Sequence, residues 1–145
     1  MKTFDSPIII EHQYKASAQQ LWQALTNLEQ MQQWYFENLP NFKPKVGFET
    51  AFVVHNEGRT FTHLWEVLVV IPQKEITYSW RFKEYKGEST SHFLIEHETE
   101  TTVNLKLVIE ILKDFPADVP EFRVESGLAG WHYFLKQRLT QFLEG

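Results

Sequence analysis

The sequence predicts an α+β fold in which one long C-terminal helix lies across a curved, six-stranded antiparallel sheet. Between residues 48 and 111, apolar and polar residues alternate in segments joined by short turns. Such segments are typical of an antiparallel meander with one covered face. Residues 120–143 instead carry apolar side chains at steps of three and four, which places them on one stripe of a helix. A sheet face and a helix stripe that are both apolar are buried by packing together.

The length, composition and net charge of the chain fit one folded domain and argue against several classes of partner. The 145 residues are expected to form a single domain, 1–145. A formal net charge of −5 argues against nucleic acid or an anionic membrane as the main partner. Because cysteine is absent, there is no disulfide, thiolate nucleophile or cysteine metal site. The apolar run Ile8–Ile10 is too short for a signal peptide or a membrane span, so we expect a cytoplasmic protein.

The N-terminal third predicts one strand followed by two short helices. A β-branched run passes into alternation over residues 8–14, which indicates a strand. Ser17 and Gln20 have the spacing of a capping box, in which each side chain bonds the other residue's backbone N–H. Asn27 interrupts the helical pattern, so a second helix is expected to end near Trp34.

Residues 37–47 hold two prolines, two asparagines and a glycine, and therefore predict a loop. Its length leaves two interpretations open. It is either a binding loop or lid, or it is slack surface chain.

Five further strands and the final helix complete the predicted fold. Turns are expected at 56–58, at Pro72–Gln73 and at 85–87, because glycine or proline stands in each. Pro120 suits the first turn of the final helix, and Glu121 adds a carboxylate at the positive end of its dipole. The predicted strands are Phe48–Val54, Phe61–Ile71, Glu75–Phe82, Thr90–Glu98 and Val103–Ile111.

Three places in the chain carry a family resemblance. They are Leu21-Trp22-Gln23-Ala24-Leu25-Thr26 with Trp34-Tyr35, then Val46-Gly47-Phe48 with Ile76-Thr77-Tyr78-Ser79-Trp80, and finally Gly130-Trp131 followed by Leu135, Leu139 and Leu143. Together they resemble the START-like, helix-grip (SRPBCC) superfamily, whose fold is also that of the birch-pollen allergen. Within it, the chain is similar to the family named for the activator of the heat-shock-protein ATPase. The resemblance covers essentially the whole chain.

The resemblance implies a helix-grip fold, and it transfers no catalytic residues. Members of the family include co-chaperone domains and resistance proteins. Relatives in the wider superfamily bind lipids, hormones or polyketides in a cavity between the helix and the sheet.

Aromatic residues make up 15% of the chain, and rings of this size fill cores but also line apolar cavities. Two glycines, Gly127 and Gly130, interrupt the final helix. They either leave room beneath the helix for a ligand or allow the helix to bend or approach the sheet closely. The candidate ligand-binding residues are Trp34, Phe36, His63, Trp65, Tyr78, Trp80, Gly127 and Trp131.

No motif indicates a metal or a cofactor. The six histidines are scattered without metal-ligand spacing, and there is no phosphate loop and no nucleophile elbow. His12 and His63 share strand faces with apolar neighbours. Each is either a core histidine bonded to a backbone or hydroxyl group, or a cavity group that orients a ligand or acts as a general base.

The sequence leaves three functional hypotheses open. The first is a binding protein for a small hydrophobic or amphipathic molecule, oriented by Tyr78, His63 and tryptophan N–H groups. The second is a co-chaperone-like interaction domain that stimulates a heat-shock ATPase. The third is a cyclase- or hydrolase-like enzyme that uses His63 or His12.

Overall fold

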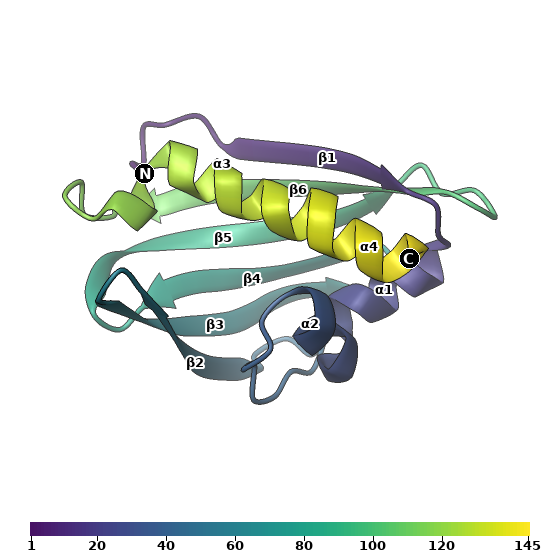
Figure 1. The fold of residues 1–145 in the computed structure, drawn as a ribbon, viewed down its shortest axis with the longest axis horizontal. Helices are drawn as coiled ribbons and strands as arrows, with labels where there is room; N and C mark the ends of the chain where they lie inside the picture. Colours follow the sequence, from purple (N-terminus) through teal and green to yellow (C-terminus); the bar gives the residue numbers. More distant parts are fainter.

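A computed structural model describes residues 1–145 and confirms the predicted fold class. One antiparallel sheet has the strand order β1-β6-β5-β4-β3-β2, so the first strand closes the meander beside the last. The C-terminal helix crosses one face of this sheet, and the two short helices lie at one end of it (Figure 1). The strands are β1 (Ile8–Tyr14), β2 (Glu49–Asn56), β3 (Arg59–Ile71), β4 (Glu75–Phe82), β5 (Tyr85–Glu96) and β6 (Val103–Lys113).

The two short helices, α1 (Ala18–Thr26) and α2 (Leu28–Trp34), are fixed by side-chain caps. The Ser17 hydroxyl accepts from the Gln20 backbone N–H at 3.1 Å, and the Gln20 side chain accepts from the Ser17 N–H at 2.8 Å. This confirms the predicted capping box, which satisfies two backbone donors that a helix end leaves free. Asn27 ends α1 and caps α2.

The C-terminal segment consists of a 3₁₀ turn, η1 (Pro120–Phe122), followed by α3 (Val124–His132), a π-helical segment η2 (Tyr133–Arg138) and α4 (Leu139–Glu144). The prediction that Pro120 opens the long helix is wrong. Arg123 has an extended backbone, with ψ of 149°, and separates η1 from α3. Glu121 therefore lies in a separate turn and not at the end of the helix dipole, where the sequence placed it.

A tyrosine from β1 satisfies the backbone of the π-helical segment. The buried Tyr14 hydroxyl donates to the Leu135 carbonyl at 2.7 Å. A π turn shifts the helical hydrogen-bond register, and the carbonyl groups it frees need other partners. Burial raises the pKa of the Tyr14 hydroxyl well above its usual range, so it remains a donor.

The turn between β4 and β5 lies two residues before its predicted position. Phe82 pairs with Tyr85, so the turn residues are Lys83 and Glu84. Gly87, which the sequence assigned to the turn, lies inside β5 with φ of +120°. This backbone conformation is readily available only to glycine.

The loop 37–47 is attached to its surroundings. The Asn38 side chain donates to the Val53 carbonyl at 2.6 Å, and the Gln32 side chain donates to the Leu39 carbonyl at 2.7 Å. Leu39 and Phe42 are buried in the core. The slack-chain interpretation is therefore wrong.

The core has two parts. A main cluster lies between the sheet and the helices, and a smaller cluster lies near η1. The smaller cluster consists of Phe61, Phe115, Val119 and Phe122. No helix is both long enough and apolar enough to cross a membrane.

Candidate functional site

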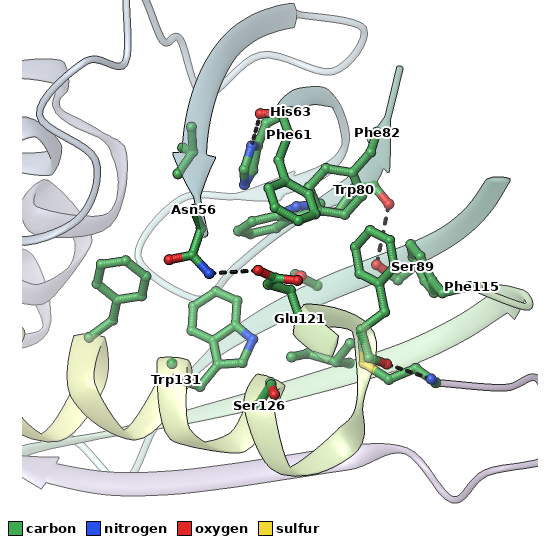
Figure 2. Close-up of a pocket in the computed structure, with 18 of the residues that line it drawn as sticks. Asn56, Phe61, His63, Trp80, Phe82, Ser89, Phe115, Glu121, Ser126 and Trp131 are labelled. Carbon is green, nitrogen blue, oxygen red and sulfur yellow. Dashed lines mark hydrogen bonds between the residues drawn. The ribbon is translucent and has the colours of Figure 1, made fainter. Parts of the chain in front are cut away.

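A pocket of about 440 Å³ lies between the sheet, α3 and η1, where the two core clusters meet. Twelve of its 21 lining residues are hydrophobic. Figure 2 shows Trp131 pointing from α3 into this space, with His63 and Trp80 on the strands across from it. The volume falls within the usual range for small-molecule sites, roughly 300–1,000 Å³.

The pocket exists because small residues face one another across it. On β5, Ser89 and Ser91 occupy positions on the same strand face as Phe93 and Ile95, which fill the core further along. Opposite them, Gly127 and Gly130 lie in α3 and line the pocket.

Both helical glycines border open space, which argues against the interpretation that they allow a close approach of the helix to the sheet. A Cβ atom at Gly130 would meet no heavy atom within 4 Å. At Gly127 it would meet the Met1 sulfur at 3.7 Å, which is an ordinary van der Waals contact. Neither glycine is therefore needed for a close approach of the helix to the sheet.

The far wall of the pocket is aromatic and rests partly on backbone. The ring of Phe115 lies against Gly87, where an added Cβ would be only 2.4 Å from the Phe115 Cδ1 atom. Phe115 also packs against Phe82 and Phe122, with ring centroids 6.2 and 5.1 Å away. These three rings line the pocket together.

Five of the eight residues proposed from the sequence line this pocket, and three do not. Those lining it are Phe36, His63, Trp80, Gly127 and Trp131. Trp34, Trp65 and Tyr78 lie outside its lining, so the expectation that they surround the same space needs correction.

Trp34, Trp65 and Tyr78 do not line the pocket because the Tyr35 side chain fills the space beside them, next to α2. Its ring stacks on Trp34 at 4.5 Å and lies 5.6 Å from Trp65. Its hydroxyl is 2.9 Å from the Tyr78 hydroxyl, so Tyr78 is engaged inside the core. The Trp34 indole donates to the Ala24 carbonyl at 2.7 Å. These side chains are core residues. The Tyr78 hydroxyl does not reach the pocket, so it cannot orient a ligand there as the sequence suggested.

His63 is a buried polar group in the pocket wall. It is 6% exposed, and its ring stacks on Phe52 with centroids 4.7 Å apart. Its Nδ1 atom lies 3.1 Å from the Phe61 carbonyl (Figure 2). A carbonyl only accepts, so the hydrogen belongs to Nδ1 and the neutral ring carries its lone pair on Nε2. Burial lowers the pKa of His63 to about 4, and the Phe61 carbonyl and Glu84 oppose this only in part.

His12, the other histidine considered, lies outside the pocket lining. Its Nε2 atom is 3.1 Å from the Thr140 hydroxyl of α4. His12 is therefore a partly buried histidine bonded to a hydroxyl group, as the structural alternative supposed. No group of three or more histidine, aspartate or glutamate side chains is arranged to hold a metal ion.

A polar cluster closes one side of the pocket, and we call it the Glu121 latch. It consists of Glu121 from η1 with Asn56 and Arg59 from the β2–β3 hairpin. Arg59 donates to the two Glu121 oxygens at 2.7 and 2.8 Å, and Asn56 donates to Oε2 at 2.6 Å. Hydrogen bonds from Arg59 lower the pKa of Glu121 to about 2. On its other side, the latch borders a hollow that is lined by Glu57, Arg59 and Ala129.

Sequence reasoning missed the residues that create the space and those that close it. Ser89 and Ser91 carry no signal in a strand pattern, because small polar residues are common there. The latch joins positions 62 residues apart, and no local pattern reports such a pair.

With this geometry established, the chain can be compared with known proteins. The family model described as Activator of Hsp90 ATPase homolog 1-like protein matches residues 15–144. The chain belongs to this family. No curated protein matches it at a significant level.

Several solved structures have the same fold as this chain. Protein CV1439 from Chromobacterium violaceum is 19% identical, with a TM-score of 0.76 and coverage of 96% of this chain and 97% of that one. Protein MLL2253 from Mesorhizobium loti is 26% identical, with a TM-score of 0.71 and the same two coverages. DynU16, a putative protein in the dynemicin biosynthetic locus, is 21% identical with a TM-score of 0.73; the match covers 97% of this chain and 48% of DynU16.

Proposed function

We propose that the protein binds a small hydrophobic or amphipathic molecule in the pocket between the C-terminal helix and the sheet. The observation that supports this most is the set of small residues on both walls. Ser89 and Ser91 face Gly127 and Gly130 around a space that ordinary core side chains would fill. A core normally packs to high density, and unfilled volume lowers stability. A bound molecule restores the lost contacts.

Filling the pocket from each wall tests the proposal. Gly130→Leu adds a side chain from α3, and Ser91→Leu adds one from β5. Ala129→Leu is the matched control, because Ala129 is an exposed neighbour in the same helix, beside the outer hollow. The probe is Nile red, an uncharged apolar dye, and binding is followed by its fluorescence.

We expect the wild type and Ala129→Leu to bind the dye, and both filled variants to bind it at least about tenfold more weakly. Native mass spectrometry of the purified wild type, beside a denatured sample, shows whether a molecule is already bound. Equal dye binding by the filled variants, with circular dichroism showing them folded, would place the bound dye elsewhere and refute the proposal.

The family match supports a second candidate, an interaction with a heat-shock ATPase of the Hsp90 type. We propose it only as a co-chaperone-like activity of the whole domain. Its test is the ATPase rate of purified Hsp90 with and without the protein. A rate that does not change at saturating protein would remove this candidate.

Of the two histidines considered for an enzymatic role, only His63 lines the pocket, because His12 lies outside it. The lowered pKa of His63 makes its imidazole a weak general base near neutral pH. We therefore place binding before catalysis.

A further inference from the structure

Resting on the proposed function, we infer that the ligand is an uncharged aromatic compound with a hydroxyl group, and that this hydroxyl donates a hydrogen bond to Nε2 of His63. Three features of the pocket lead to this ligand class. They are the fixed tautomer of His63, the absence of an available ion in the interior, and the ring-lined walls.

The first feature is a hydrogen-bond acceptor that the protein does not use. Nδ1 of His63 is committed to the Phe61 carbonyl, which leaves Nε2 as an acceptor. Figure 2 shows the second ring nitrogen on the side of the imidazole away from this carbonyl. The hydrogen bond of the His63 ring uses Nδ1, so Nε2 stays free, and His63 lines the pocket. A ligand that brings a donor to this nitrogen therefore gains a hydrogen bond that a ligand without a donor lacks.

The second feature concerns charge. Two charged groups lie at the edge of the pocket: Glu121 is paired with Arg59, and the Met1 amino group donates to the uncharged Phe122 carbonyl at 2.7 Å. The remaining lining consists of aromatic and aliphatic side chains, serines, glycines, an asparagine and two histidines. Beside His63, an ionised group of a ligand would lose its hydration and would meet aromatic rings instead of a counter-ion. A neutral ligand avoids this loss.

The third feature is the shape and chemistry of the walls around His63. Its ring centroid lies 5.3 Å from Phe36, 5.4 Å from Trp80 and 4.8 Å from Phe82. Such rings favour offset-stacked and edge-to-face contacts with another aromatic ring. A planar ring that bears a hydroxyl can therefore pack on these walls while its O–H reaches the imidazole. The Ser91 hydroxyl on β5 is another polar group in the lining of the pocket.

The test compares three probes that share one ring system: 2-naphthol, 2-methoxynaphthalene and 2-naphthoate. The first offers a donor, the second lacks it, and the third is ionised at pH 7.5. Dissociation constants are measured by isothermal titration calorimetry. We expect the wild type to bind 2-naphthol at least about tenfold more tightly than either of the others, which is the scale of one hydrogen bond to a buried acceptor.

Two variants identify the acceptor. His63→Phe keeps an aromatic ring and removes the lone pair, so we expect it to bind 2-naphthol and 2-methoxynaphthalene equally. His12→Phe is the matched control outside the pocket, and it should keep the wild-type preference. If His63→Phe does not fold, the imidazole nitrogen spectrum of the wild type replaces it. The Nε2 resonance of His63 should move with 2-naphthol and stay in place with 2-methoxynaphthalene.

The outcomes separate this inference from the proposed function. Equal affinity of the wild type for 2-naphthol and 2-methoxynaphthalene overturns the inference but leaves binding in the pocket intact. Tighter binding of 2-naphthoate overturns the uncharged class. Binding of none of the three probes overturns the inference, and the Nile red measurement then decides whether the proposed function fails with it.

Discussion

The buried, neutral His63 makes the stability of the protein depend on pH in a defined window. Its pKa is about 4 in the folded protein against an ordinary value of 6.5, because burial disfavours the charged ring. Below pH 6.5 the unfolded chain gains a proton that the folded chain does not. The stabilisation is therefore complete above pH 6.5, and it is lost as the pH falls from 6.5 to 4.

The size of this effect follows from the two pKa values. At 1.36 kcal/mol per pKa unit, the loss approaches about 3 kcal/mol below pH 4 and is about 2 kcal/mol at pH 5. Glu121 also has a lowered pKa, but its stabilisation is lost only as the pH falls from 4.5 towards 2. A comparison between pH 7.5 and pH 5 therefore isolates the histidine from this carboxylate.

The assay is urea unfolding of the wild type and His63→Gln at pH 7.5 and pH 5. We expect the wild type to lose about 2 kcal/mol more between these two pH values than the variant does. Ser91→Ala serves as the control, because it alters the same pocket wall without removing a titrating group, and it should follow the wild type. Equal pH dependence of the wild type and His63→Gln would refute the account of a buried, neutral imidazole.

Three further predictions concern the helix and the pocket edge. Gly130→Ala should raise the free energy of unfolding by about 0.5–1 kcal/mol in urea titrations, because the added methyl enters open space; a loss of stability would contradict this. Tyr14→Phe should lower it by about 1–3 kcal/mol in the same assay, because the Leu135 carbonyl loses its shorter hydrogen bond and keeps only the 3.5 Å contact with the Thr140 hydroxyl; an unchanged midpoint would show that this bond is dispensable. Glu121→Gln weakens the contact with Arg59, so stopped-flow mixing should show faster entry of Nile red. An unchanged entry rate would mean that the dye enters elsewhere.

Most of the fold could be predicted because its signals are local. Alternation located every strand, and the Ser17–Gln20 spacing located the start of α1. The wrong predictions concern glycine and proline, because each of these residue types occurs in more than one kind of local structure. Gly87 was assigned to a turn, although its positive φ belongs to an irregular position within β5. Pro120 fits the first turn of a 3₁₀ segment as well as that of an α-helix, and sequence alone does not distinguish them.

The pocket could be predicted only in part, for a physical reason. Periodicity identifies which side chains face the helix, and Trp65, Tyr78 and Trp80 do so together. It does not show where along that face a space remains. The Tyr35 side chain packs against Trp65 and Tyr78 and so bounds the pocket at the end near α2. The space itself comes from small side chains such as Ser91, and a missing volume leaves no pattern in a sequence.

Through its contact with Phe115, Gly87 affects the size of the pocket although Gly87 itself does not line it. Any side chain at Gly87 would collide with the Phe115 ring, whose Cδ1 atom lies 2.4 Å from the position of an added Cβ. The ring would have to shift, and it forms part of the pocket wall. A substitution at this single position near the β4–β5 turn would therefore change the shape of the pocket without changing the identity of any residue that lines it.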